Sequence, residues 1–455
     1  MTVKEQLTRA RQSFNSGITK DVGFRRKQLA QLEKGLREMK QEILHALKED
    51  LNKSHYEGFL TEIGIVLSEV EYARKHIKGW SRVKPVLPTL SQLPSLGTIY
   101  PEPYGVVLVL SPWNYPFQLC MTPVIGAIAA GNTVVIKPSK QARETGKVVE
   151  KLVKNYLDSF AYQVVLDENA NDMLLEEEFD YIFFTGSSEV GKTVLEKASK
   201  HLTPVSLELG GKSPCVVDKG INTDQVARRI LFGKLLNAGQ TCVAPDYLLV
   251  QADVKERLVE SLINEYVSMM KDSSYIKENF PRIINEKHYK RLESVLEGED
   301  ILFQDTRLQG DQFPFTIVNY AGHETPLMRD AIFGPILPVV SYKSLDEAIG
   351  FIRNKEKPLA LYFFSKNPKA IKKILREVSF GGGCINDTVL HLSSPRMPFG
   401  GVGHSGMGSY HGKKSFETFS HYKSVLKKGF LGDIPLRYHP YKDPKGTVPS
   451  FLLTK

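Results

Sequence analysis

Short strand-like runs alternate with helical runs from Gly105 onward, and this alternation limits the possible folds more than any other feature of the sequence. The first series runs in this order: strand 106–110, helix from Pro116, strand 133–136, helix from Thr145, strand 163–166 and strand 181–184. Such an order predicts a parallel sheet with helices on both faces, which binds nucleotides at the carboxyl ends of its strands. A second series has strands near Leu248, Leu337 and Cys384 and helices near Glu256, His288, Leu345 and Ile371. It predicts a second, catalytic α/β half, so the 455 residues are expected to form two or three domains.

Amphipathic helices and an extended arm are expected before this region. Apolar residues at steps of three and four predict one helix over 24–48 and another over 61–80, both covering something larger. Between Ser81 and Pro103, five prolines exclude a long helix and favour an extended arm. We expect this arm to lie on a partner subunit.

The net charge and the cysteines bear on partners and compartment. The charge of +9 at pH 7 allows an anionic partner. The basic residues are spread among acidic neighbours without an aromatic–basic RNA motif, so no nucleic-acid binding is expected. Four scattered cysteines without CxxC spacing argue against disulfides and zinc, which favours a cytoplasmic protein without a metal. The N-terminal segment lacks an export signal, and we expect no membrane-spanning segment.

One cysteine lies where a nucleophile is expected. Cys242 stands in the polar stretch NAGQTCVAP (237–245), between a helical run and a strand-like run. A lone cysteine is more often a small buried hydrophobe, so its neighbours in sequence motifs matter. Glu208, in an apolar strand before two glycines, offers a general base for the thiol or for water. Asn114 offers an amide N–H to an oxyanion, and the three residues together indicate covalent thiol catalysis.

A glycine-rich turn and a lysine offer a candidate nucleotide site. The run FTGSSEVG (184–191) is expected to be a strand, a turn and a helix start, where Gly186 and Gly191 let the backbone approach a ligand. It is not the GxGxxG fingerprint, so phosphate binding and a plain turn weigh about equally. Lys137 ends a strand on the same edge, where it meets either ribose or phosphate oxygens or only solvent.

Seven motifs occur in the order found in the aldehyde dehydrogenase superfamily, and the chain resembles that family over nearly its whole length. They are PWNYP (112–116), KPS (137–139), FTGS with GxxxxG (184–191), LELGGKSP (207–214), NAGQTC (237–242), IFGP (332–335) and MPFGGVGHSG (397–406). The ending SYHGKKSF (409–416) and the short length resemble the class 3, fatty and aromatic aldehyde branch.

The resemblance implies an α/β fold with a Rossmann-type nucleotide-binding domain (1–80 and 104–209) and an α/β catalytic domain (210–408). A bridging or oligomerisation arm (81–103 and 417–435) and an irregular tail (436–455) complete it. Members of this branch are usually homodimers.

The resemblance also implies the reaction. Cys242 attacks an aldehyde to give a thiohemiacetal, Asn114 and the Cys242 N–H hold its oxyanion, and hydride transfer to NAD or NADP leaves a thioester. Glu208 activates the water that releases the carboxylic acid. Medium or long aliphatic and aromatic aldehydes are the expected substrates. The implied cofactor contacts are Trp113, Lys137, Lys140, Gly186, Ser187, Gly191, Leu209 and Phe333.

Two positions depart from the family pattern. Lys140 replaces a glutamate that repels a 2′-phosphate, which favours use of NADP. Ala331 replaces a glutamate that grips the nicotinamide ribose; Asp330 beside it is expected on an extended strand, pointing to the other face, so hydride transfer is expected to be slow. Two alternatives stay open. One is an esterase or thioesterase that uses Cys242 without a cofactor, and the other is a catalytically weakened binding protein.

Overall fold

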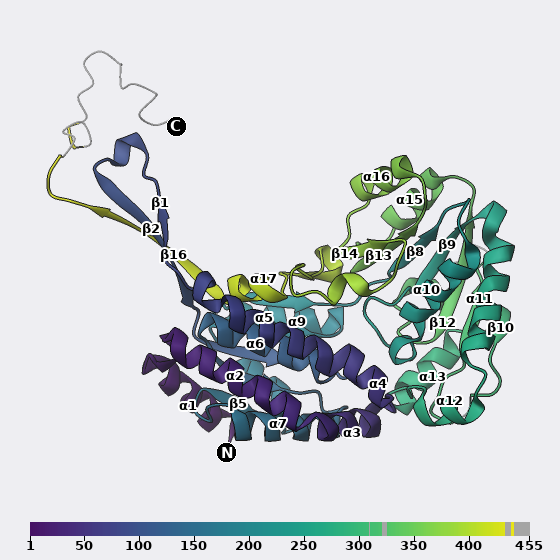
Figure 1. Cartoon of the computed structure of the whole chain (residues 1–455), viewed down its shortest axis with the longest axis horizontal. Helices are drawn as coiled ribbons and strands as arrows, with labels where there is room; N and C mark the ends of the chain where they lie inside the picture. Colours follow the sequence, from purple (N-terminus) through teal and green to yellow (C-terminus); the bar gives the residue numbers. More distant parts are fainter. Residues whose placement is uncertain (309, 321–324, 433–437, 441–455) are drawn as a thin grey trace, which may run out of the picture.

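A computed structural model describes residues 1–308, 310–320, 325–432 and 438–440. Two α/β bodies lie side by side, and a thin arm projects from the first of them (Figure 1). The first body holds a six-stranded sheet in the order β15-β7-β6-β3-β4-β5, and the second holds a seven-stranded sheet in the order β10-β11-β12-β9-β8-β13-β14. The arm is a three-stranded sheet in the order β1-β2-β16. The predicted α/β class with parallel sheets is confirmed.

The six-stranded sheet is the predicted nucleotide-binding architecture. Its strands are β3 (Val106–Leu110), β4 (Thr133–Lys137), β5 (Tyr162–Val164), β6 (Tyr181–Thr185), β7 (Val205–Glu208) and β15 (Gly406–Met407). All pairs are parallel except β15 with β7. Successive residues of β3 point into two different cores, with Val107 and Val109 in one and Val106 and Leu108 in the other. Burial on both faces explains why this strand is a continuous apolar run.

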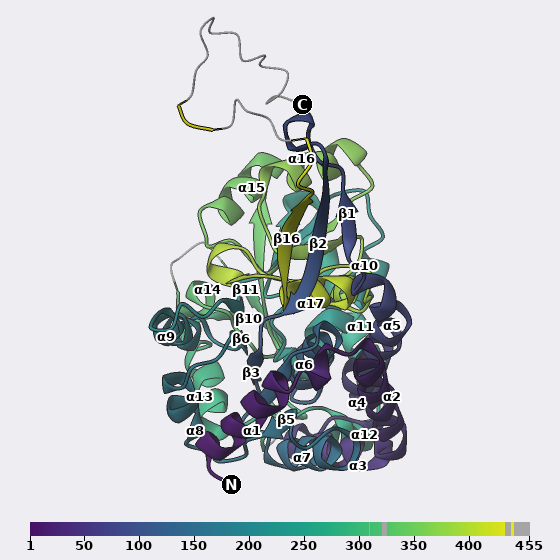
Figure 2. The ribbon, with the colours of Figure 1, turned by 90° about the vertical axis from the view of Figure 1, so that its left-hand side faces the viewer.

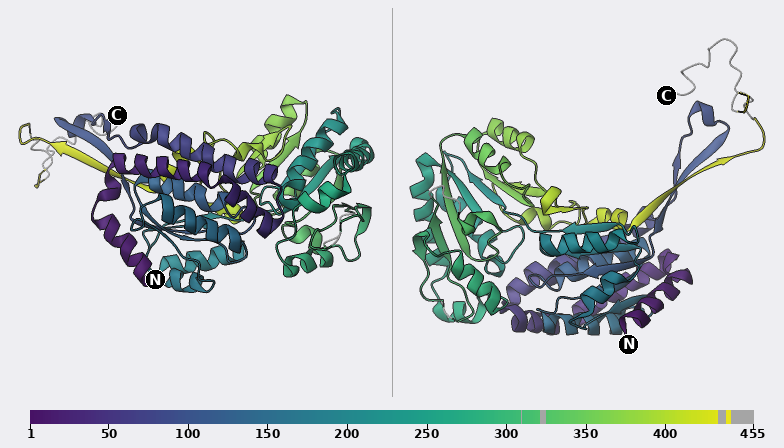
Figure 3. Two further views of the ribbon diagram at one scale, coloured as in Figure 1. Left: turned by 60° about the horizontal axis from the view of Figure 1, so that its bottom comes forward. Right: turned by 180° about the vertical axis from the view of Figure 1, so that it is seen from behind.

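Helices cover both faces of this sheet. They are α1 (Val3–Asn15), α2 (Val22–Glu38), α3 (Lys40–Leu51), α4 (His55–Gly58), α5 (Gly64–Trp80), α6 (Gln118–Ala130), α7 (Arg143–Tyr156), α8 (Ala170–Glu176) and α9 (Ser188–Ser199). The purple N-terminal helices lie along one side of the body in Figures 1 and 3. The prediction of one helix over 24–48 is wrong, because the chain breaks at Met39 (φ −90°, ψ 10°) into α2 and α3. Both helices bury leucines in the same core, so the apolar pattern runs through the break.

The seven-stranded sheet follows the second predicted series. Its strands are β8 (Pro214–Val217), β9 (Tyr247–Gln251), β10 (Asp300–Gln304), β11 (Thr316–Asn319), β12 (Ile336–Tyr342), β13 (Ala360–Phe364) and β14 (Gly382–Ile385). Its helices are α10 (Thr223–Leu235), α11 (Lys255–Met269), α12 (Ser273–Asn279), α13 (Glu286–Ser294), α14 (Pro326–Arg329), α15 (Leu345–Arg353) and α16 (Pro368–Glu377). Only the edge strand β10 pairs antiparallel, so the carboxyl ends of the other strands share one edge.

The arm joins chain segments from both ends of the sequence. It contains β1 (Lys84–Val86), β2 (Ser95–Pro103) and β16 (Ser420–Lys428), and α17 (Gly412–Thr418) leads into the last strand. Figure 2 shows β2 and β16 running side by side, and Figure 1 shows the arm projecting from the body. The extended conformation predicted for 81–103 is therefore confirmed. The predicted tail (436–455) lies outside the described residues except for 438–440. Within the described parts of the chain, none of the helices combines the length and apolar character needed to cross a membrane.

Candidate active site

Cys242 follows a tight turn between α10 and β9. Asn237 (φ 51°), Ala238 (φ 51°) and Gly239 (φ 74°) are consecutive residues in the left-handed region. Such backbone costs energy for side chains with a Cβ, and its persistence at one place is typical of functional sites. A Cβ at Gly239 would lie 2.3 Å from the Gly334 carbonyl oxygen, so the turn packs directly on the IFGP segment. The half-buried thiol thus stands on a loop that packs closely against a second segment of the chain.

The segment PWNYP lies against this loop. The Asn114 side-chain amide donates to the Gln240 carbonyl oxygen at 3.1 Å, and the Asn237 amide donates to the Asn114 carbonyl oxygen at 2.7 Å. The Tyr115 hydroxyl bonds to the Thr241 hydroxyl at 2.6 Å, next to the cysteine. Asn114 is therefore held beside the residues that lead into Cys242, as oxyanion stabilisation requires.

Glu208 ends β7 and faces the same region. Its side chain is 3% exposed, and neither carboxylate oxygen has a hydrogen-bond partner among the described residues. Burial raises the pKa of Glu208 well above its ordinary value. Burial, and then the carboxylate of Glu208, raise the pKa of the Cys242 thiol to about 12. The structure thus brings the two groups within electrostatic reach of each other and keeps the thiol protonated at neutral pH.

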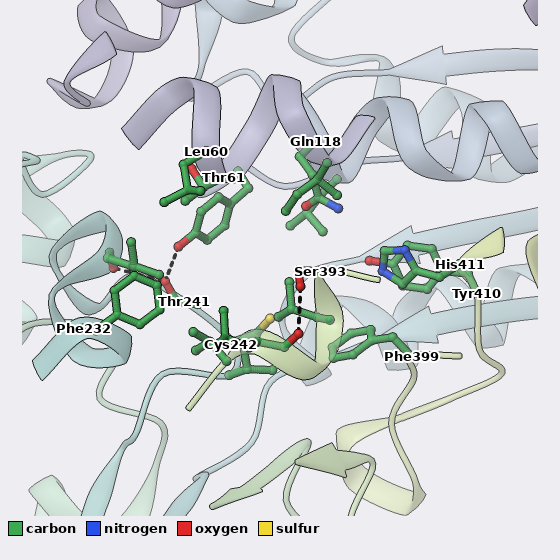
Figure 4. A pocket seen from close by; sticks show the side chains of 18 residues that line it. Leu60, Thr61, Gln118, Phe232, Thr241, Cys242, Ser393, Phe399, Tyr410 and His411 are labelled. Atoms are coloured by element: carbon green, nitrogen blue, oxygen red, sulfur yellow. Dashed lines mark hydrogen bonds between the residues drawn. The ribbon is translucent and has the colours of Figure 1, made fainter. Parts of the chain in front are cut away.

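The thiol opens into an apolar pocket. The empty volume is about 780 Å³, including part that is open to solvent. Figure 4 shows Cys242 between Thr241 and Phe232 on one side and Phe399 and Tyr410 on the other. The remaining lining includes Leu60, Ile65, Leu119, Leu236, Val389 and Leu390. A pocket of this size and composition suits a small apolar ligand.

The glycine-rich turn lies at the start of α9 and fits the phosphate groups of a nucleotide. Ser187 caps α9, and its hydroxyl accepts a hydrogen bond from the Val190 N–H at 3.4 Å. A Cβ at Gly191 would lie 2.6 Å from the Leu209 side chain, so glycine lets the helix start approach β7 closely. Gly186 donates its N–H to the Glu208 carbonyl oxygen at 3.0 Å, and backbone N–H groups at a helix start such as that of α9 can bind an anion. Gly186, Ser187, Gly191 and Leu209 thus share one edge of the sheet with Glu208.

The other predicted cofactor contacts divide between two places. Lys137 is 3% exposed, and its ammonium donates to the Pro138 carbonyl oxygen at 2.9 Å. Burial lowers the pKa of Lys137, and the nearby charge of the exposed Lys140 lowers it further. Trp113 and Phe333 form an edge-to-face ring pair with centroids 5.5 Å apart. Both aromatics belong to segments that contact the nucleophile loop.

Asp330 does not lie on a strand as expected. It caps the C-terminal end of α14, and its exposed side chain precedes the irregular segment that carries Ala331. Across the described residues, no three histidine, cysteine or acidic side chains gather as metal ligands.

Several residues around the site escaped the sequence analysis. Lys53 and Glu62 form a fully buried ion pair behind Asn114, and Asn237 links the Asn114 carbonyl to the nucleophile loop. No local sequence pattern marks Lys53 or Glu62 as buried. Asn237 stands in the quoted motif NAGQTC, where an amide before a glycine turn was a usable signal.

Comparisons with known proteins show the family to which the chain belongs. The model of the aldehyde dehydrogenase family matches residues 1–425. The 4,4'-diaponeurosporen-aldehyde dehydrogenase of Staphylococcus aureus is 43% identical over 99% of both chains. A dimeric NADP-preferring aldehyde dehydrogenase of Rattus norvegicus is 43% identical over 95% of this chain and 96% of its own. A solved substrate-bound state of Staphylococcus aureus AldH superposes with a TM-score of 0.93 at 42% identity, covering 97% of this chain and 98% of that one. The family expected from the ordered motifs is confirmed: this chain belongs to the aldehyde dehydrogenase family and is an NAD(P)-dependent oxidoreductase that acts on aldehydes.

Proposed function

We propose that Cys242, Glu208 and Asn114 carry out the oxidation of an apolar aldehyde to its carboxylic acid. The observation that carries this proposal is the unpartnered, buried Glu208 beside a protonated thiol at the end of an apolar pocket. The raised pKa of Glu208 means that, in its ionised form, this carboxylate is a strong base. It takes the thiol proton as sulfur forms its bond to the carbonyl carbon, and the carbonyl electron pair moves to oxygen.

The oxyanion of this adduct is stabilised by the Asn114 side-chain amide and the backbone N–H of Cys242. Support comes from the bond of the Asn114 amide to the Gln240 carbonyl, two residues before the nucleophile. When bound, the nicotinamide cofactor accepts the hydride that the adduct carbon loses. Glu208 first releases the thiol proton to solvent. It then removes a proton from the water that attacks the thioester, and it gives this proton to the Cys242 sulfur, which leaves as thiol.

The cofactor is held by Trp113, Lys137, Lys140, Gly186, Ser187, Gly191, Leu209 and Phe333. Support comes from the start of α9, where backbone N–H groups of a helix can bind an anion, and from Gly191, which lets this helix start pack closely against Leu209. Lys140 is exposed near Lys137, where it offers a positive charge to a 2′-phosphate. We therefore propose that the enzyme uses NADP at least as well as NAD.

The substrates are medium or long aliphatic or aromatic aldehydes. Support comes from the apolar lining around Cys242 and from the relative in Staphylococcus aureus, which is named for 4,4'-diaponeurosporen-aldehyde. The hydrolase and binding-protein alternatives are not favoured, because the family and its relatives are dehydrogenases.

The same proposal extends to assembly and location. We propose a homodimer formed through the arm, supported by its exposed apolar side chains, among them Leu87 and Leu96, and by the rat relative named as dimeric. Sedimentation of the purified protein tests this. We propose domains at 1–80 with 104–209, at 210–408 and at 81–103 with 417–435, which limited proteolysis tests. A cytoplasmic location is supported by four free cysteines and is tested by cell fractionation.

The central test is the formation of reduced nicotinamide with one aromatic and one long-chain aldehyde, each with NAD and NADP. We expect turnover that the Cys242→Ala variant lacks. Glu208→Gln is expected to accumulate the thioester, which mass spectrometry detects on the peptide that contains Cys242. Cysteine-dependent ester cleavage without aldehyde turnover would instead support the hydrolase alternative.

A further inference from the structure

A lysine that the proposed reaction does not use is fully buried behind the oxyanion site. Lys53 lies between the end of α3 and the cap of α4, and its side chain is 0% exposed. Its ammonium donates to Glu62 Oε1 at 2.5 Å and to the Asn114 carbonyl oxygen at 2.9 Å. It also stands 3.9 Å from the centre of the Tyr115 ring. A buried ammonium is costly unless it is paired, and here a carboxylate, a carbonyl oxygen and the face of an aromatic ring stabilise it.

Its partner Glu62 holds the other end of the same segment. Glu62 is also 0% exposed, and its second oxygen accepts the N–H groups of Phe117 at 3.0 Å and Gln118 at 2.8 Å. These N–H groups belong to the start of α6, where backbone donors have no partner within the helix. Glu62 itself stands in a π-helical turn (Phe59–Ile63), a distortion frequent at functional sites. The ion pair therefore binds the backbone at both ends of the segment 114–118. Lys53 binds its first carbonyl oxygen, and Glu62 binds its last two N–H groups.

The Asn114 carbonyl oxygen is shared with the nucleophile loop. It accepts one hydrogen bond from Lys53 and a second, at 2.7 Å, from the Asn237 amide. The Asn237 amide also donates to the Gln240 carbonyl at 3.2 Å, the same oxygen that accepts from the Asn114 side chain. Both lone pairs of the Asn114 carbonyl oxygen thus accept hydrogen bonds. Loss of the Lys53 ammonium is therefore expected to shift the side-chain amide of Asn114 relative to Cys242.

We propose that Lys53, paired with Glu62, is a positioning residue for oxyanion stabilisation: it fixes the backbone of Asn114 so that its side-chain amide meets the aldehyde oxygen at Cys242. The inference rests on the proposed role of Asn114. Lys53 touches neither substrate nor cofactor and acts only through Asn114. Loss of one oxyanion donor lowers kcat by about a hundred- to a thousandfold, and a shift of about 1 Å costs on the order of a hundredfold.

The experiment is a double-mutant cycle of Lys53→Met and Asn114→Ala. Methionine keeps most of the length of the side chain and removes the ammonium. For Lys53→Met we expect kcat for aldehyde oxidation to fall about 10- to 100-fold, with the Kd for NADP unchanged. Cofactor-free hydrolysis of 4-nitrophenyl acetate, which forms an oxyanion at the same cysteine, is expected to fall in parallel. With Asn114 already replaced, Lys53→Met is expected to add little further loss.

Losses that multiply in the double variant overturn the inference, because Lys53 would then act elsewhere. An unchanged kcat in Lys53→Met with a large loss in Asn114→Ala also overturns it. If Asn114→Ala itself leaves kcat unchanged, the proposed role of Asn114 fails instead. Lys234→Met, at the other fully buried lysine described, is the matched control and is expected to keep kcat. If Lys53→Met does not fold, Glu62→Gln replaces it in the same cycle, with the same criteria. This variant weakens the hydrogen bonds to the N–H groups of Phe117 and Gln118.

Discussion

Replacement of Lys140 by glutamate is expected to turn the enzyme away from NADP. Lys140 is exposed and lies near Lys137, at the edge of the sheet proposed for the adenosine ribose. With lysine, the 2′-phosphate of NADP meets a positive charge, and with glutamate it meets a negative one. NAD carries no phosphate at this position, so its binding is expected to change much less.

The size of the effect follows from the exposure of Lys140. In water, two unit charges about 4 Å apart interact by about 1 kcal/mol. Reversal of the side-chain charge against a phosphate of charge about −2 changes the interaction by about 4 kcal/mol before screening. Salt at about 0.15 M and the freedom of an exposed side chain reduce this to about 2 kcal/mol. Because 1.4 kcal/mol is a factor of ten, the NADP-to-NAD ratio of kcat/KM is expected to fall about 30-fold.

The assay compares kcat/KM for both cofactors in the wild type and in Lys140→Glu at low and high salt. The change in the ratio is expected to shrink as salt rises, since screening weakens exposed charges. Lys154→Glu, at an exposed lysine near the far end of α7, is the control and is expected to keep the wild-type ratio. A strong preference of the wild type for NAD, or an equal change in Lys154→Glu, refutes the reasoning.

Three further perturbations test other parts of the structure. Burial raises the pKa of Glu208, so the folded protein keeps a proton that the unfolded chain releases, and stability falls as pH rises above the ordinary pKa of 4.5. Glu208→Gln is expected to remove this decrease of the free energy of unfolding with pH, which urea-unfolding curves at several pH values measure. The same decrease in both proteins would argue against a proton held by Glu208. Gly239→Ala puts a Cβ 2.3 Å from a backbone oxygen, whereas Gly220→Ala, at a similar φ, has no atom within 4 Å. We expect the free energy of unfolding to fall by about 3 kcal/mol or more in Gly239→Ala and by about 1 kcal/mol in Gly220→Ala. Equal losses in the two variants would contradict the packing argument. Ala331→Glu restores the family's glutamate, so it is expected to raise kcat and to reduce the deuterium isotope effect on kcat with an aldehyde labelled at C1. If the wild type shows no such isotope effect, hydride transfer does not limit its turnover.

Local patterns predicted the elements whose neighbours are also apolar. β3 was predicted with its observed bounds, because a strand buried on both faces is an uninterrupted apolar run. The glycine-rich turn before α9 was predicted for the same kind of reason, since a strand end, a glycine and a capping serine are adjacent in sequence. The motif residues Asn114, Glu208 and Cys242 also come together as expected.

Features that depend on distant contacts were not predicted. The break between α2 and α3 is hidden because both helices contribute leucines to one core. Helix α1 was missed because it is largely polar, although Thr2 and Glu5 form a capping box that marks its start. The burial of Lys53 and Glu62 follows only from the packing of α5 and the π-helical turn (Phe59–Ile63) against α6, which joins segments far apart in the chain.

The arm has a consequence for how the chain is made. Its strand β2 pairs with β16, so that Thr98 and Val425 lie opposite each other although 327 positions separate them. At a synthesis rate of about 5–20 residues per second, β2 emerges from the ribosome roughly 15 to 65 s before its partner exists. During that interval one edge of β2 is open to pairing with other nascent chains. Pro101 and Pro103 lie in β2 and lack N–H donors, but their nitrogens face away from β16 in the alternating ladder, so the edge that awaits β16 keeps its own N–H donors.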